Sequence, residues 1–334
     1  MKKIMLYFSA LLVCGSLVFI GCVKKDTKPD DASTQQQNAD DDARIQNESN
    51  SAADDANSAI AGSNENSSAR MAATTSNPLR KTYLNIVAGS DSVVVDSTST
   101  RTITIYYNKI SNVNGRKRSG TITITSLSGT PWSQAGSQIL LKFNLTCTRV
   151  KDTKTITLTG SKTITNVNGG LVSTLGVGQS VTHRIQAPQD STGLTITFDN
   201  GKTVNWHTDR TRTITYVKTD TILGIPVRAY KVTLIGNGIQ AGNSSLAWWG
   251  VDRQGENFYA SIPTQIDYDQ SVDWLGPISG ALQVTGTARP FNITYGVDGN
   301  GNIVSNPSAG NLPYGYEISW TDLNGKSRTV VLPY

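Results

Sequence analysis

The sequence predicts an all-β protein with one or two antiparallel β-sandwich-like domains behind a disordered or partly helical N-terminal linker. Three observations predict this class. Many short segments alternate polar and apolar residues with a period of two, they are rich in Thr, Ile, Val and Tyr, and Gly-containing turns separate them. Such segments fill residues 78–334, as in "RTITIYY", "GTITITS", "KTITLTG" and "RTITYV". Hairpins join most of them, so we expect about fourteen or more antiparallel strands.

Residues 1–21 have the pattern of a secretory signal peptide, in which two lysines precede an uninterrupted run of apolar and small residues. The run is about 18 residues long and could just span a bilayer as a helix, so a retained membrane anchor is the alternative. The tetrapeptide "FIGC", which ends at Cys22, resembles the lipobox of bacterial lipoproteins. The resemblance implies that Cys22 carries acyl chains such as palmitate, which would attach the protein to a membrane without a transmembrane helix.

The chain has three cysteines, of which Cys14 belongs to the signal peptide and Cys22 to the lipid site. Only Cys147 is left for the folded part, and it has no partner there. It lies in the alternating stretch "KFNLTCTRV", so we expect it to be buried in a strand as a small apolar residue.

Residues 22–77 follow as a polar, acidic linker, and residues 23–70 hold ten acidic against five basic residues. A segment this poor in large apolar residues cannot bury enough surface to offset its chain entropy, so we expect a solvated spacer. A short helix is possible at residues 39–61, where apolar residues recur at roughly helical spacing (Ile45, Ala52, Ala56 and Ile60). A partner-binding role for that helix is the alternative.

Residues 71–334 are basic, with 23 basic against 15 acidic residues. The densest basic cluster is "GRKRSG", whose Arg116, Lys117 and Arg118 lie between a turn signal and an alternating strand. We therefore expect them in solvent at the start of a strand. The basic charge is compatible with an anionic polysaccharide or surface as partner. No nucleic-acid partner is expected, because no aromatic platform or nucleic-acid-binding motif accompanies the cluster.

The β-rich region forms one unit or two. If there are two, we expect the boundary near residues 186–192, where "QAPQDSTG" interrupts the strands. Weak internal similarity, such as the repeated "TIT" runs and the shared "NVNG" turn, arises from duplication or from strand composition alone.

Little in the sequence points to catalysis, so we expect a protein that is not an enzyme. The two histidines, His183 and His207, lie in strand-like text, where we expect surface or half-buried positions, and we expect no metal site or cofactor. Glycoside hydrolysis needs two carboxylates across a cleft. In "QIDYDQ", Asp267 and Asp269 would point to the same face of a strand, which leaves a glycoside-type hydrolase as a weaker alternative.

Aromatic residues offer a candidate ligand site, because flat rings can stack on sugar rings. Adjacent Trp248 and Trp249 cannot both face inward from one strand. Three further tryptophans, Trp132, Trp206 and Trp320, are expected to anchor the core. The candidate ligand-binding residues are Trp248, Trp249, Tyr259, Tyr268 and Trp274.

Several phrases, including "DDARIQNESNSAADDANSAI", "GRKRSGTITIT", "PWSQAGSQI" and "RPFNITYGVDGNG", resemble a group of Bacteroidota cell-envelope lipoproteins of unknown function. The group combines a signal peptide, an acidic linker and a β-rich domain. The resemblance implies a lipid-anchored cell-envelope protein, on either face of the outer membrane, and carries over no activity. We expect non-catalytic binding of a glycan or another surface ligand, with a structural or adhesive surface protein as the alternative.

Overall fold

The computed structural model describes residues 30–63, 80–84, 87–96, 102–113, 115–187, 193–222, 225–273, 276–288, 290–322 and 324–334. The all-β prediction is confirmed for these residues. Their helices are the α-helix α1 (Asp30–Gly62) and the short 3-10 helix η1 (Val172–Thr174). The strands are β1 (Arg80–Tyr83), β2 (Ser92–Asp96), β3 (Thr102–Val113), β4 (Arg116–Ser126), β5 (Ser137–Arg149), β6 (Thr155–Asn166), β7 (Ser180–Ala187), β8 (Leu194–Phe198), β9 (Thr203–Ile222), β10 (Ile225–Gly236), β11 (Gly238–Gln240), β12 (Asn243–Val251), β13 (Asn257–Asp269), β14 (Ser279–Thr285), β15 (Phe291–Val297), β16 (Gly315–Thr321) and β17 (Ser327–Pro333).

All of these strands belong to one antiparallel sheet, and the 20-residue strand β9 lies at its centre. One edge of β9 pairs with β8 and then β7, and from there the sheet continues through β6, β5, β4, β3 and β2 to β1. The other edge pairs with β12 and β10, and the sheet continues through β13, β14, β15 and β16 to β17. Most neighbours in the sheet are neighbours in the sequence, as hairpin connections require.

The hairpin turns lie where the sequence predicts them. Gly201 and Gly325 adopt φ values of 80° and 74°, which residues with a side chain rarely adopt. In the second of these turns, the carboxylate of Asp322 accepts hydrogen bonds from the backbone N–H groups of Asn324 and Lys326, each at 2.9 Å. These local bonds fix the turn and thereby the register of β16 against β17.

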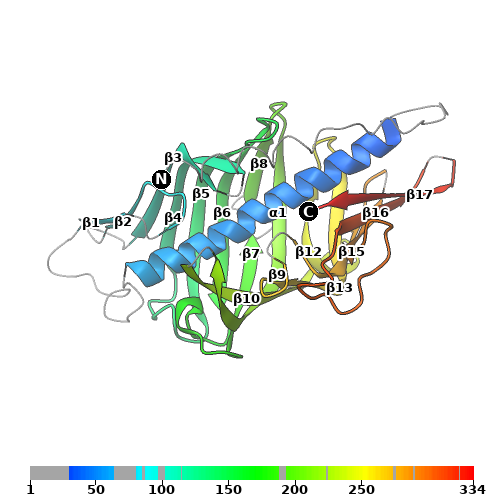
Figure 1. Ribbon diagram of the computed structural model, residues 1–334. Helices are drawn as coiled ribbons and strands as arrows, with labels where there is room; N and C mark the ends of the chain where they lie inside the picture. Colours follow the sequence, from blue (N-terminus) through cyan, green and yellow to red (C-terminus); the bar gives the residue numbers. More distant parts are fainter. Residues whose placement is uncertain are drawn as a thin grey trace, which may run out of the picture.

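Helix α1 takes the place that a second sheet would have in a sandwich. Figure 1 shows it crossing one face of the sheet, from the C-terminal strands β15–β17 toward the N-terminal strands. Its polar side chains contact strands that lie far apart in the sheet, from Tyr107 of β3 to Trp248 of β12. The helix therefore packs against an extended part of one curved sheet.

The sequence of α1 explains how a polar helix can be buried. Small residues lie on its inner side and let the backbone approach the strands closely, among them Ala39, Ala52, Ala53, Ala56 and Ala59, each at most 2% exposed. Polar and charged residues on the same side find partners on the sheet. Only a narrow stripe of α1 is exposed, which we call the outer stripe; it is formed by Ala43, Asn47, Asp54, Ser58 and Gly62, which recur at roughly helical spacing.

The structure corrects the expectation of a solvated spacer for residues 30–63. The helix is longer than the predicted 39–61 segment, and its inner face belongs to the core of the β-rich region. The rest of the predicted linker, residues 22–29 and 64–77, lies outside the described residues, as do the signal peptide and Cys22. Of the proposed domain boundary, residues 188–192 also lie outside them, and the strands on both sides of it belong to the same sheet.

Candidate ligand-binding cavity

A cavity of about 400 Å³ lies between the outer stripe of α1 and strands from both halves of the sheet. Ala43, Asn47 and Asp54 of the helix line one side of it. The opposite side comes from β9, β10, β12, β13, β15, β16 and the C-terminal residue Tyr334. The volume is within the range of about 300–1,000 Å³ that is typical of small-molecule sites.

Five aromatic side chains line this cavity: Trp248, Tyr268, Tyr295, Tyr316 and Tyr334. The last three form a row, with ring centres 6.2 Å apart between Tyr295 and Tyr316 and 6.1 Å apart between Tyr316 and Tyr334. Gly276 makes room for the row, because a Cβ atom there would lie 2.3 Å from the ring of Tyr334. We call these five residues the aromatic wall.

Two features hold the aromatic wall in place. The hydroxyl of Tyr334 donates a hydrogen bond to the carbonyl of Pro277 and accepts one from the backbone N–H of Gly296. The indole N–H of Trp248 donates to the carboxylate of Asp42 on α1. By contrast, the hydroxyls of Tyr268 and Tyr295 make no hydrogen bond with any described residue, so they are available to a ligand. Burial raises the pKa of both phenols, which therefore keep their protons.

Polar groups complete the lining. The amide side chains of Gln46, Asn47 and Asn50 come from the helix, and the guanidinium groups of Arg210 and Arg212 come from β9. Arg210 is 1% exposed, and its two terminal nitrogens donate to the side-chain oxygens of Gln46 and Asn50. The cavity thus combines ring faces with hydrogen-bond donors and acceptors.

Asp42 has an unusual electrostatic environment at the edge of this cavity. Burial raises its pKa to about 7, and the hydrogen bond from Trp248 and the charge of Arg210 offset only part of that effect. At neutral pH, its protonated and ionised forms are therefore both populated.

Buried ion pairs fix α1 relative to the sheet and so determine the width of the cavity. Glu48 contacts Arg116 at 2.9 Å and Arg118 at 2.6 Å, and Arg118 also contacts Asp55 at 2.6 Å. Burial disfavours the ionised form of Glu48, but the two arginines outweigh this effect and hold its pKa below the usual value. The solvent-exposed position predicted for Arg116 and Arg118 is wrong, because their partners lie on a helix that the sequence did not place in the core.

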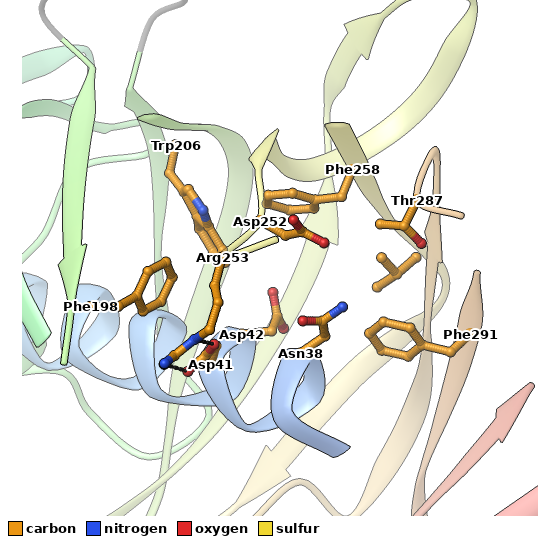
Figure 2. A pocket seen from close by; sticks show the side chains of 11 residues that line it. Asn38, Asp41, Asp42, Phe198, Trp206, Asp252, Arg253, Phe258, Thr287 and Phe291 are labelled. Carbon is orange, nitrogen blue, oxygen red and sulfur yellow. Dashed lines mark hydrogen bonds and ion pairs between the residues drawn. The ribbon is translucent and has the colours of Figure 1, made fainter. Parts of the chain in front are cut away.

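A second, much smaller cavity of about 20 Å³ lies beside the N-terminal half of α1 (Figure 2). There Arg253 pairs with Asp41 at 2.6 Å and lies 4.4 Å from the centre of the Phe198 ring. Trp206 and Phe258 pack together nearby, with ring centres 4.8 Å apart. This volume accommodates a water molecule and is too small for a sugar ring, so we interpret the region as a helix-anchoring contact.

The structure divides the predicted ligand-binding residues between the two faces of the sheet. Trp248 and Tyr268 line the large cavity. Trp249 faces the opposite side, where it is 9% exposed, lies 5.9 Å from the ring of His207 and covers Gly238. Tyr259 is directly opposite Trp249 in the ladder and so lies on that side too, against Gly286. Trp274 lies outside the described residues. The four described residues therefore do not form one patch.

The structure also shows where the predicted core tryptophans, Cys147 and the two histidines lie. The predicted core anchors Trp132, Trp206 and Trp320 are buried, as is Cys147 in β5, which is free. His207 is half-buried as expected, but His183 is 1% exposed and packs 5.2 Å from the Trp132 ring.

Asp267 and Asp269, the carboxylates of the hydrolase alternative, are absent from the cavity lining. Asp267 lies 3.8 Å from the amino group of Lys231, and Asp269 accepts hydrogen bonds from the backbone and hydroxyl of Ser271 in the turn after β13. Both carboxylates therefore take part in local contacts.

Within the described ranges, no three His, Cys, Asp or Glu side chains converge as metal ligands. Among the helices of the described part of the chain, none combines the length and apolar character needed to cross a membrane. Comparison with protein-family models, with curated proteins and with solved structures finds no match.

Sequence reasoning missed most of the cavity. Tyr295, Tyr316 and Tyr334 each lie in or beside a C-terminal strand, and no spacing in the sequence indicates that they meet. Arg210 and Arg212 lie on the inner face of β9 between buried Trp206 and Ile214, which was the one available signal, because an inward-facing arginine requires a polar partner.

Proposed function

We propose that this protein is a lipid-anchored binding protein of the bacterial cell envelope, and that it binds a glycan in the cavity between α1 and the sheet without cleaving it. The observation that carries the proposal is the aromatic wall beside the helix amides in a cavity of about 400 Å³. Ring faces can pack against the C–H surfaces of sugars, and the amides and free phenols can hydrogen-bond to sugar hydroxyls. The site needs no metal and no catalytic carboxylate pair.

Anchoring through acyl chains on Cys22 is part of the proposal, as is location at the outer membrane on its periplasmic or outer face. The anchor is supported by the signal-like N-terminus and the lipobox-like "FIGC". The location is supported by the proposed relation to Bacteroidota envelope lipoproteins, which rests on phrases such as "GRKRSGTITIT" and "RPFNITYGVDGNG". A Cys22→Ala variant is expected to lose its association with membranes after processing. Continued fractionation with membranes of the variant whose signal peptide has been removed would overturn the lipid anchor.

Affinity electrophoresis tests the binding proposal. The purified full-length protein is run through gels cast with individual neutral and acidic polysaccharides, and the same mixtures are assayed for released reducing ends. We expect retardation by at least one polysaccharide, with no sugar release. If the folded protein is retarded by none of them, glycan binding is overturned and a structural or adhesive role takes its place; sugar release would indicate a hydrolase.

Two variants connect retardation to the cavity. Tyr295→Ala removes one ring of the aromatic wall and is expected to abolish retardation. Tyr314→Ala is the matched control, because Tyr314 is 50% exposed and lies outside the cavity lining. Urea unfolding of both variants checks that they remain folded, and Asn47→Ala, at an exposed helix position in the lining, provides a second variant with little expected effect on folding.

A further inference from the structure

Three cationic side chains gather beside the cavity with a single carboxylate among them. Lys162 comes from β6, and Arg210 and Arg212 come from β9. Arg212 pairs with Asp54 of the helix, at 2.5 Å and 3.1 Å. The three cations are close enough that Arg210 and Arg212 both lower the pKa of Lys162, in addition to the larger effect of its burial. We call these three residues the basic cluster.

Neutral groups alone hydrogen-bond two members of the basic cluster. The terminal nitrogens of Arg210 donate to the side-chain oxygens of Gln46, Ser49 and Asn50. The amino group of Lys162 donates to the backbone and hydroxyl oxygens of Ser49, 2.9 Å for the hydroxyl. Among the described residues, no carboxylate lies within ion-pair distance of either cation, and both side chains are at most 1% exposed.

Other arginines that face α1 are arranged differently. Arg118, Arg149 and Arg253 each contact at least one aspartate or glutamate of the helix. Arg212 follows that pattern through Asp54, whereas Lys162 and Arg210 depart from it beside the cavity. Burying a cation without a counter-charge is costly, and an anion in the adjacent cavity would lower that cost.

We propose that the glycan bound in the cavity is acidic, and that its carboxylate or sulfate group lies at the end of the cavity formed by Arg210 and Arg212. The inference rests on the proposed glycan-binding function and specifies its ligand. Two further acids line the cavity, and of these Asp42 acts on Arg210 through its charge without forming an ion pair with it. The carboxylate of Asp42 accepts the hydrogen bond of the Trp248 indole. Asp273 lies at the end of the cavity near Tyr334, whose pKa is raised by burial and, to a smaller degree, by Tyr268 and Asp273.

Matched polysaccharides test the charge requirement on the full-length protein. Acidic polysaccharides are compared with their own carboxyl-reduced or desulfated forms in affinity gels and by titration calorimetry. We expect binding to the acidic form and at least about tenfold weaker binding to its neutralised form, because a charge-assisted contact is lost. Equal affinity for both forms would overturn the acidic ligand and leave glycan binding standing. If neither form, nor any neutral polysaccharide, binds the folded protein, the proposed function itself is overturned.

Two substitutions test the location. Arg212→Gln is expected to weaken binding of the acidic form about tenfold and to change binding of a neutral glycan little. Asp54→Asn removes the carboxylate partner of Arg212 at an exposed position, so it is expected to strengthen binding of the acidic form. If both substitutions leave the affinity for the acidic form unchanged in folded protein, the anionic group does not lie at this end of the cavity.

Discussion

Trp248 of β12 and Asp42 of α1, 206 residues apart in the chain, are joined by a hydrogen bond of 2.5 Å from the indole N–H to the carboxylate. The contact is buried, and both residues also line the cavity. It therefore couples the position of the helix to the shape of the proposed binding site. Other buried contacts along α1 have the same effect, because they hold the helix at a fixed height above the strands.

Asp42→Asn is expected to change how stability depends on pH. The pKa of Asp42 is about 7 in the folded protein, mainly because of burial, against 3.8 for an ordinary aspartate. Between these values the folded state holds a proton that the unfolded state has lost, so this group's contribution to stability falls as pH rises from about 4 to 7. Each pKa unit corresponds to about 1.4 kcal/mol.

Urea unfolding of the wild type and of Asp42→Asn at pH 5 and pH 7.5 measures this contribution. The variant retains an acceptor for Trp248 and is expected to lose less stability than the wild type between the two pH values. The comparison with the variant is needed because other charged or titratable groups face Asp42: Asp41, Arg210, Tyr268 and Tyr295. An identical loss in both proteins would contradict the assigned pKa.

Glu48→Gln is expected to destabilise the protein by about 3–5 kcal/mol, because it leaves Arg116 and Arg118 partly unpaired in the helix–sheet contact. Asp54→Asn is the matched helix variant, since the side chain of Asp54 is 50% exposed, and its cost is expected to be about 0–1 kcal/mol. The midpoints of urea unfolding give both values. Similar losses of unfolding free energy for the two variants would show that the buried ion pairs of Glu48 do not hold α1 against the sheet.

His183→Phe is expected to make the protein less sensitive to acid. Burial, with a smaller effect from Arg212, lowers the pKa of His183 to about 3, whereas an exposed histidine titrates near 6.5. Between pH 6.5 and pH 3, His183 is protonated in the unfolded state and neutral in the folded state. Its contribution to stability is therefore lost as the pH falls below about 6.5. A phenyl ring keeps the packing on Trp132. Thermal unfolding at pH 7 and pH 4.5 should show a smaller difference for the variant, and an unchanged difference would contradict this role.

The strands could be predicted because their information is local. Period-two alternation and Gly-containing turns appear within ten residues, and segments such as Ser137–Arg149 and Leu194–Phe198 become strands with the expected alternating burial. Turn chemistry is equally local, as at Gly325.

The helix and the cavity could not be predicted in the same way. Gln46 and Asn50 would be solvated in the isolated segment, and in the folded protein they are half-buried against Arg210, 164 and 160 residues away. The same separation explains the error at Arg116 and Arg118, whose acidic partners lie about 70 residues earlier. A polar helix is buried only when the opposite surface matches it, and composition does not contain that information.

The central claim, that the cavity between α1 and the sheet is the ligand site, is tested most directly by filling it. Ala43 and Ser58 both lie on the exposed stripe of α1, but only Ala43 lines the cavity. Ala43→Trp should place an indole in the binding space, whereas Ser58→Trp places one outside it. The measurement is the affinity of both variants for the polysaccharide that retards the wild type. We predict that Ala43→Trp abolishes binding and that Ser58→Trp preserves it; wild-type affinity in a folded Ala43→Trp variant would contradict the account.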